Sequence, residues 1–178
     1  MRDKLLTVVI ISVLASCQPS SIPFFPKTEV CITDYGARGD GEYLNTAAFE
    51  KAVEDLSSRG GGHLVVPAGI WLTGPIELRG NIDLHLERNA VISFSPDTSL
   101  YKVVDINFEG KDTKRCQPQI SCRNQRNVAI TGYGIIDGNG DSWRELDPDK
   151  VPPRVFRRMA GRPGVIDGTT GKWYPDEG

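Results

Sequence analysis

The carboxyl groups with the most suggestive spacing for acid–base chemistry belong to Asp137 and Asp141, which flank the turn sequence Gly138-Asn139-Gly140. Two carboxyl groups that face each other across a substrate can act as general acid and general base. A structural role is simpler, because an aspartate at a strand end accepts hydrogen bonds from the amides that follow it. The spacing therefore favours a turn-forming Asp137 over a catalytic pair.

The histidines and cysteines form no pattern of metal ligands. His63 and His85 are far apart in the sequence, and no Cys-x-x-Cys motif occurs. His85 alternates with apolar neighbours, so we expect it on the outer face of a strand rather than in the role of a base. Three cysteines are expected to be small buried side chains rather than disulfide partners: Cys31, Cys116 and Cys122.

Four arginines are better candidates for ligand binding: Arg154, Arg157, Arg158 and Arg162. A guanidinium group can hold a carboxylate through two parallel hydrogen bonds, so this cluster suits a ligand that carries several carboxylates. The same cluster also suits a solvated basic loop. Both interpretations are open from the sequence alone.

The N-terminus has the features of an export signal. A positively charged start precedes an apolar run from Leu5 to Leu14, which is shorter than the about 20 residues that span a bilayer. The sequence Leu14-Ala15-Ser16-Cys17 resembles the lipobox of bacterial lipoproteins, in which cleavage precedes a cysteine that is then lipidated. We predict a signal peptide over residues 1–16, a lipid anchor at Cys17 and a flexible tether over residues 17–28.

The elements that would position these residues are short strands. Residues 63–95 contain several short alternations of apolar and polar residues, separated by turn residues. Each alternation predicts a strand with one buried face. No helix-length segment separates these strands, which excludes βαβ units and leaves a sandwich, a barrel or a solenoid. The segment from Asn127 to Gly132 repeats the pattern of Asn81 to Leu86, as successive coils of a solenoid would.

One amphipathic helix is predicted over residues 45–57, with Asn45 or Thr46 as its cap. Its apolar face comprises Ala48, Phe49, Ala52, Val53 and Leu56. A lone helix before a run of strands is suited to cover the open end of a strand stack. We expect the strands to occupy residues 29–142, beginning with a strand from Glu29 to Thr33. An inserted loop with one strand is expected over residues 96–118, and irregular structure over residues 143–178.

Composition agrees with a soluble β protein. The chain has 178 residues, of which 39% are apolar and 25% charged, which is enough for one domain with a core. Nineteen glycines and twelve prolines favour a turn-rich architecture over a helical bundle. The net charge of −2 gives no general attraction to nucleic acid or to anionic membranes.

A series of short motifs follows in order along the chain: DYGARGDG (34–41), NTAAF (45–49), GGG (60–62), VVPAG (65–69), LTGPI (72–76), NIDLHL (81–86), VAITG (128–132) and GIIDGNG (134–140) with Trp143. This ordered set resembles the N-terminal part of glycoside hydrolase family 28, the bacterial polygalacturonase-type enzymes. The resemblance covers about residues 30 to 143. Pectate-lyase-like and tailspike-like proteins open with a similar first motif, whereas the later motifs together are more specific to family 28.

The resemblance implies an all-β fold, a right-handed parallel β-helix of the pectin-lyase-like type. This chain would supply its N-terminal coils and capping helix, and would be incomplete. The family hydrolyses α-galacturonosyl linkages in pectic polysaccharide, polygalacturonate or rhamnogalacturonan, with inversion. Inversion requires an acid and a base whose carboxyl groups are about 6.5–9.5 Å apart. The resemblance implies no metal or organic cofactor.

The chain departs from the family at its catalytic motifs. Family members carry Asn-Thr-Asp, Asp-Asp, Gly-His-Gly and Arg-Ile-Lys, and this sequence contains none of them. Asn45-Thr46 is followed by Ala47, and Gly62-His63 is followed by Leu64. We therefore expect truncation before the catalytic residues, no catalytic residue in this chain, and no activity of this chain alone.

The sequence thus predicts a family 28 glycosidase, exported and held as a lipoprotein in the periplasm or at the cell surface of a bacterium. Its expected partners are pectic polysaccharide and, through the lipid, the membrane, with no role for nucleic acid. Two other functions are open. One is a non-catalytic truncated product or carbohydrate-binding β-helix module, and the other is a pectate-lyase-like or tailspike-like protein.

Overall fold

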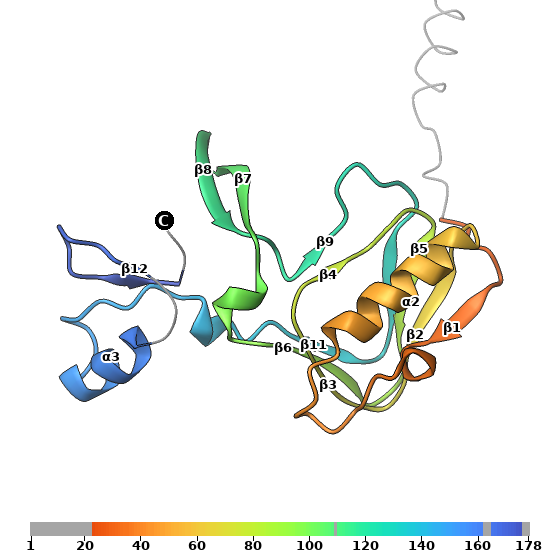
Figure 1. Ribbon diagram of the computed structural model, residues 1–178, viewed down its shortest axis with the longest axis horizontal. Helices are drawn as coiled ribbons and strands as arrows, with labels where there is room; N and C mark the ends of the chain where they lie inside the picture. Colours follow the sequence, from red (N-terminus) through yellow and green to blue (C-terminus); the bar gives the residue numbers. More distant parts are fainter. Residues whose placement is uncertain (1–22, 109, 162–164, 176–178) are drawn as a thin grey trace, which may run out of the picture.

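The computed structural model describes residues 23–108, 110–161 and 165–175, and its centre is a coil of short parallel strands (Figure 1). The first sheet consists of β1 (Glu29–Cys31), β2 (Gly62–Val66), β5 (Ile82–Leu86) and β10 (Ala129–Gly132). The second consists of β3 (Gly69–Thr73), β6 (Ala90–Phe94) and β11 (Ile135–Asp137), and the third of β4 (Ile76–Glu77) and β9 (Ile120–Ser121). The chain passes from the first sheet to the second and third and then returns, so successive passes stack as the coils of a parallel β-helix, as predicted.

The coils stack in the register that the sequence repeat predicted. Leu84 of β5 lies opposite Ile130 of β10, so the two copies of the repeated pattern are aligned residue by residue. Leu64 of β2 lies opposite Leu84 on the other side. Leu64 and Leu84 are completely buried, which shows that the alternating apolar residues form the interior of the coil.

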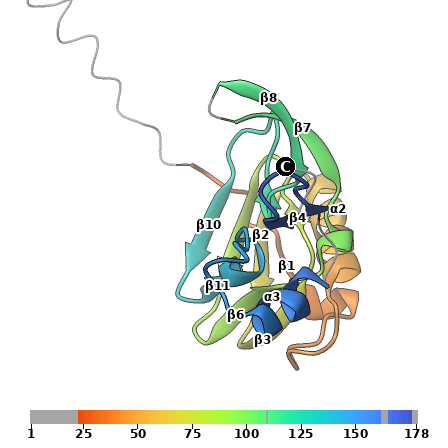
Figure 2. The ribbon, with the colours of Figure 1, turned by 90° about the vertical axis from the view of Figure 1, so that its left-hand side faces the viewer.

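Helix α2 (Thr46–Ser58) closes one end of this coil. Its predicted apolar face is buried in the same core as the strands: Ala48, Phe49, Ala52, Val53 and Leu56. The helix contacts β1, β2, β4 and β5. Figure 2 shows β10 on the opposite side of the body from the helix. The predicted capping role of the helix is therefore confirmed.

The predicted cap residue is confirmed in position but not in its side-chain bond. Asn45 occupies the N-cap position, but its side chain makes no capping hydrogen bond. Its Oδ1 accepts from the backbone amide of Arg38 at 2.7 Å, and its Nδ2 donates to the carbonyl of Leu72 at 3.0 Å. Thr46 Oγ1 instead accepts from the amide of Gly74 at 2.7 Å. These side chains therefore fasten the preceding loop and the helix to the first full coil.

Residues with left-handed backbone conformation turn the corner before three strands of the first sheet, β2, β5 and β10. Gly61 (φ +105°), Asn81 (φ +62°) and Asn127 (φ +57°) occupy corresponding positions in successive coils. Asparagine tolerates this conformation better than most residues. Asn127 Nδ2 donates to Asn81 Oδ1 at 3.1 Å, so the corner residues also bind one another along the stack.

Three segments differ from the sequence prediction. The first strand ends at Cys31, and a short 3₁₀ helix η1 (Ile32–Tyr35) follows it. The insertion carries η2 (Thr98–Leu100) and an antiparallel hairpin of β7 (Val103–Phe108) and β8 (Lys111–Cys116), which projects from the coil (Figure 1). The segment expected to be irregular contains η3 (Gly140–Ser142), α3 (Pro153–Ala160) and a two-stranded pair of β12 (Val165–Ile166) with β13 (Trp173–Tyr174).

The three cysteines of the described segments are not disulfide-bonded. Cys31 and Cys116 are partly buried, but Cys122 is exposed, so the expectation of a buried side chain was wrong there. Among residues 23–108, 110–161 and 165–175, none of the helices has the length and apolarity needed to span a bilayer. The predicted signal peptide (residues 1–16), Cys17 and the first part of the tether lie outside the described residues.

Candidate functional site

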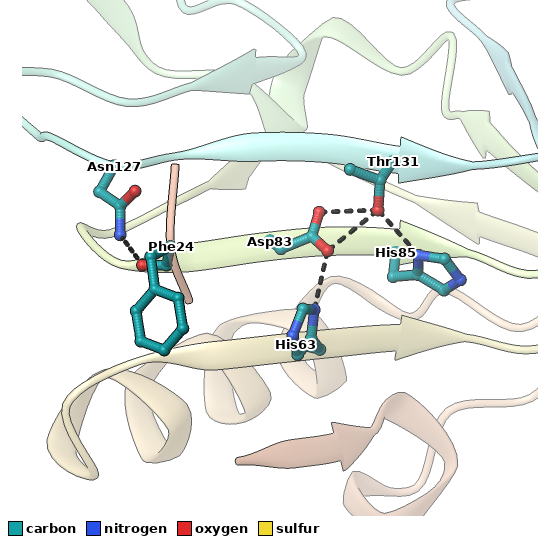
Figure 3. Close-up of polar contacts among 6 residues, drawn as sticks. All are labelled: Phe24, His63, Asp83, His85, Asn127 and Thr131. Atoms are coloured by element: carbon teal, nitrogen blue, oxygen red, sulfur yellow. Dashed lines mark hydrogen bonds and ion pairs between the residues drawn. The ribbon is translucent and has the colours of Figure 1, made fainter. Parts of the chain in front are cut away.

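Both histidines of the chain belong to one hydrogen-bonded group on the outer face of the first sheet (Figure 3). We call His63, Asp83, His85 and Thr131 the polar network. His63 Nδ1 lies 2.8 Å from Asp83 Oδ2, and Thr131 Oγ1 lies 2.9 Å from both carboxylate oxygens. His85 Nδ1 lies 2.7 Å from Thr131 Oγ1. The network therefore links β2, β5 and β10, which are strands of three successive coils.

The number of protons fixes the direction of these hydrogen bonds. A threonine hydroxyl has a single proton. If Thr131 donates it to the Asp83 carboxylate, His85 Nδ1 must carry a proton and donate to Thr131. An ionised Asp83 is acceptor-only, so His63 Nδ1 must also be a donor.

Burial shows what the polar network can do. Asp83 is only 3% exposed, and the ring of Phe25 lies 5.8 Å from the ring of His63. A carboxylate–imidazole pair resembles the arrangement of a general base, but here the Asp83 carboxylate bridges His63 and Thr131 on two other coils, and the ring of Phe25 packs against that of His63. A satisfied buried network instead holds its strands in one register. We therefore assign the network a structural role that joins the coils.

The carboxylate pair considered from the sequence does not form a site. Asp137 Oδ1 accepts from the backbone amide of Asn139 at 2.9 Å, which is the predicted turn-forming role. Asp141 is exposed and lies 3.7 Å from the guanidinium of Arg144. The two carboxyl groups thus serve separate local contacts.

The electrostatics of the described carboxyl groups give the same result. Five of them have pKa values that clearly depart from normal, and all five pKa values are lowered: Asp40, Asp55, Glu145, Asp147 and Asp167. Hydrogen bonds from backbone amides are the first cause for Asp40, Asp147 and Asp167. The general acid of a glycosidase instead needs a raised pKa. These five groups are therefore unsuited to that role.

A groove of about 330 Å³ beside α2 contains three further carboxyl groups, those of Glu50, Glu54 and Glu77. All three side chains are exposed. Arg79 and Lys102 also line this groove, so it carries both signs of charge. The described residues contain no group of three or more potential metal ligands.

The predicted basic cluster is more ordered than the sequence suggested. Arg154, Arg157 and Arg158 lie on α3 and are exposed, whereas Arg162 lies outside the described residues. Residues three and four apart share one face of a helix, so these guanidinium groups point in similar directions. Figure 1 shows α3 at the opposite end of the long axis from α2. This face could bind a ligand with several carboxylates.

Signals in the sequence could have found both features. Pro153 at the start and Gly161 after the end are typical helix boundaries, so the helical arrangement of the arginines was predictable. The aligned repeat places His85 opposite Thr131, and Asp83 lies beside His63 in the same sheet. The outward polar positions of the repeat were thus the signal for the polar network.

Comparison with known proteins identifies the architecture. No protein-family model matches the chain. A "Probable polygalacturonase" of Vitis vinifera is 42% identical over 121 residues, which cover 63% of this chain and 25% of the relative. An "Exo-poly-alpha-D-galacturonosidase" of Dickeya chrysanthemi is 33% identical over 138 residues, covering 67% of this chain and 20% of the relative. The chain therefore spans only a quarter or less of the length of these curated relatives.

A solved structure of a polygalacturonase-type protein is also similar to this chain. The exopolygalacturonase of Thermotoga maritima superimposes with a TM-score of 0.63 and 37% identity, over 78% of this chain and 34% of that chain. The predicted incomplete right-handed parallel β-helix is thus confirmed. Fold and sequence together support the polygalacturonase family, glycoside hydrolase family 28, with this chain corresponding to part of the length of its members.

Proposed function

We propose that the whole protein is a glycosidase that hydrolyses α-galacturonosyl linkages of pectic polysaccharide with inversion. The observation that carries the proposal is the 42% identity to a polygalacturonase over 121 residues. The names of the Dickeya and Thermotoga proteins, which specify exo-acting enzymes, further support a polygalacturonate substrate. In this proposal the chain supplies the capping helix and first coils, on which the later coils would stack.

The acid and base of the reaction are proposed to lie outside this chain. Its described carboxyl groups with shifted pKa values are shifted in the wrong direction for a general acid, and the sequence lacks the family's catalytic motifs. The test is to incubate the purified chain with polygalacturonate and measure reducing ends, with the Thermotoga enzyme as positive control. We expect no release above background. Robust release would contradict the proposal.

A lyase would be distinguished in the same assay. Elimination forms an unsaturated product that absorbs in the ultraviolet, whereas hydrolysis does not. A fusion of this chain with the segment of a family member that carries the catalytic motifs should release reducing ends without that absorbance. Ultraviolet absorbance would favour a pectate-lyase-like protein instead.

The second candidate function is carbohydrate binding without catalysis, and the basic face of α3 favours it. We infer that Arg154, Arg157 and Arg158, together with Arg162, bind the carboxylates of a polyuronate. Replacing the first three with glutamine should weaken binding to oligogalacturonate by about tenfold or more, because hydrogen bonds to charged groups are among the strong ones. The matched control is Arg123→Gln with Arg126→Gln, in an exposed loop before β10. Equal weakening of oligogalacturonate binding in both variants would contradict a specific role for the α3 arginines.

We also propose that the protein is exported and anchored by a lipid at Cys17, in the periplasm or at the cell surface. The order of the N-terminal features supports this: a positive start, an apolar run and then Leu14-Ala15-Ser16-Cys17. Labelling with radioactive palmitate in a bacterial host tests it. Label should enter the parent chain and be absent from Cys17→Ser. Equal labelling of both would exclude an anchor at this cysteine.

A further inference from the structure

We propose that the surface from which the tether leaves the coil binds an anionic lipid bilayer. We define this exit surface by Phe24, Lys27, Arg123 and Arg126. The inference rests on the proposed lipid anchor at Cys17 and adds which face of the coil meets the membrane. It would orient the first sheet toward the bilayer.

The tether is fastened to the coil where it leaves. We call residues 23–28 the strap. Asn127 Nδ2 donates to the carbonyl of Phe24 at 2.7 Å, and the amide of His63 donates to the carbonyl of Thr28 at 2.8 Å (Figure 3 shows the first of these). The ring of Phe25 packs against His63 between these two bonds. Both ends of the strap are thus held, so the exit point has a defined position on the first sheet.

The length of the tether keeps this exit point near the anchor. Only residues 18–23 separate Cys17 from Phe24, and a fully extended chain of that length spans about 25 Å at most. A lipid on Cys17 would therefore hold Phe24 within that distance of the bilayer. The face that carries the exit point therefore lies within reach of the headgroups.

The side chains on this face suit such a surface. Phe24 is 81% exposed, although its backbone is bound. Lys27, Arg123 and Arg126 are also exposed. Arg126 adjoins Asn127, which binds the Phe24 carbonyl, so the backbone of Phe24 lies at the corner that carries the cationic loop. Apolar rings beside cationic side chains are the features that bind the interface of an anionic membrane.

The acidic groups around this surface do not cancel its charge. Glu29 on β1 is exposed and lies opposite His63. Asp83 on β5 is buried and bonded to His63 and Thr131. Arg79, at the neighbouring corner of the previous coil, adds a further exposed cation next to Gly80, whose amide donates to Gln125 at 2.7 Å. The whole chain has a net charge of −2, so any attraction to anionic lipid must come from a local cationic surface rather than from the overall charge.

The test uses residues 18–178, which contain every described residue but neither the signal peptide nor Cys17. Co-sedimentation is measured with vesicles of phosphatidylcholine, with and without phosphatidylglycerol. We expect binding only to the anionic vesicles. Arg123→Gln with Arg126→Gln should reduce it by about tenfold or more, and Phe24→Ala by several-fold. The matched control, Arg154→Gln with Arg157→Gln on α3, should bind vesicles like the parent chain.

Measuring oligogalacturonate binding by the same variants distinguishes a surface for anionic lipid from a surface for polyuronate. Loss of oligogalacturonate binding in Arg123→Gln/Arg126→Gln, with vesicle binding unchanged, would overturn the inference and assign the surface to polysaccharide. Equal vesicle binding by the parent chain and Phe24→Ala would also overturn it, provided that both unfold at the same temperature. Palmitate labelling tests the anchor independently. If the parent chain is labelled with palmitate but the variants bind vesicles as well as the parent chain does, the anchor is present and the proposed surface is wrong.

Discussion

The two ends of the coil contain the same kind of apolar side chain in opposite environments. At the α2 end, Phe49 is 1% exposed and Leu64 is fully buried. At the other end, Ile130 lies opposite Leu84 and Ile136 lies opposite Ile92, so both continue the interior stacks. Ile130 is nevertheless 48% exposed and Ile136 is 40% exposed.

This difference shows that the strand pattern alone does not make a core. A coil in a stacked protein is stabilised mainly by its two neighbours. β5 and β6 have a coil on each side, whereas β10 and β11 have a described neighbour on one side only. The last coil should therefore open more easily than the coils next to the helix.

The largest expected effect comes from the middle of the stack. Leu84→Ala should lower the free energy of unfolding by about 2–5 kcal/mol, because a buried side chain is lost between two coils. Ile130→Ala, in the same stack but half exposed, should cost only about 1 kcal/mol. Urea unfolding of both variants gives the two values. Equal costs would show that Ile130 is as well packed as Leu84.

The corner glycines at the capped end offer a second contrast. A Cβ at Gly61 would overlap the carbonyl group of Asn81, whereas one at Gly60 would meet nothing within 4 Å. Both residues have positive φ, so Gly60→Ala should cost about 1–2 kcal/mol from backbone strain alone. Gly61→Ala should cost about 2–4 kcal/mol because overlap is added. Thermal unfolding of the pair measures the difference, and equal melting temperatures would refute the predicted overlap.

The polar network should couple the two ends. Asp83→Asn should lower stability by about 1–3 kcal/mol, since the amide replaces one acceptor oxygen of this buried network with a donor NH₂ group and removes the charge. Hydrogen exchange of the β10 amides should also accelerate. Asp137→Asn, at an exposed turn, is the control and should change stability by about 0.5 kcal/mol or less. Unchanged exchange in Asp83→Asn would mean that the network does not hold β10.

High pH should lower the stability of the protein through Tyr101, which follows η2 in the insertion. Burial raises the pKa of Tyr101 to about 12, above its ordinary value of 10. The neutral phenol is therefore favoured in the folded state, so its contribution is complete below pH 10 and is lost as the pH rises toward 12. The urea midpoint of the parent chain should fall across this window, and that of Tyr101→Phe should fall less. Parallel curves would contradict the assignment.

Low pH should lower the stability of the protein by a smaller amount, through Asp55 on the capping helix α2. The hydroxyl of Tyr35 and then the guanidinium of Arg59 lower the pKa of Asp55 on α2. The carboxylate is thus favoured in the folded state, so its contribution is complete above about pH 4 and is lost as the pH falls further. Tyr35→Phe should make the urea midpoint less sensitive to acid. A variant with the same acid sensitivity as the parent chain would rule out this contribution.

Much of the fold was predictable because its signals are local and repeated. Alternating apolar residues predicted the strands, and helical spacing predicted the buried face of α2. The repeat of the Asn81 pattern at Asn127 predicted the register of β5 and β10. The β7–β8 hairpin was only half predicted, since its second strand, residues 111–116, is polar and has no apolar alternation. α3 was missed although its proline and glycine boundaries were visible.

The candidate site was less predictable because it depends on distances between coils. His63 and Asp83 are 20 residues apart, and Asp83 and Thr131 are 48 residues apart. Only the register of three strands brings these side chains together. The role of Asp137 was predictable because its partner, the amide of Asn139, is two residues away.

The bond between Phe24 and Asn127 joins residues 103 positions apart, whereas most contacts of the coil join one pass to the next. A contact of such high sequence separation forms late, because everything between its ends must first be ordered. A chain that emerges with its N-terminus first must therefore complete β10 before the strap can dock. The strap thus reports that three passes of the coil have assembled.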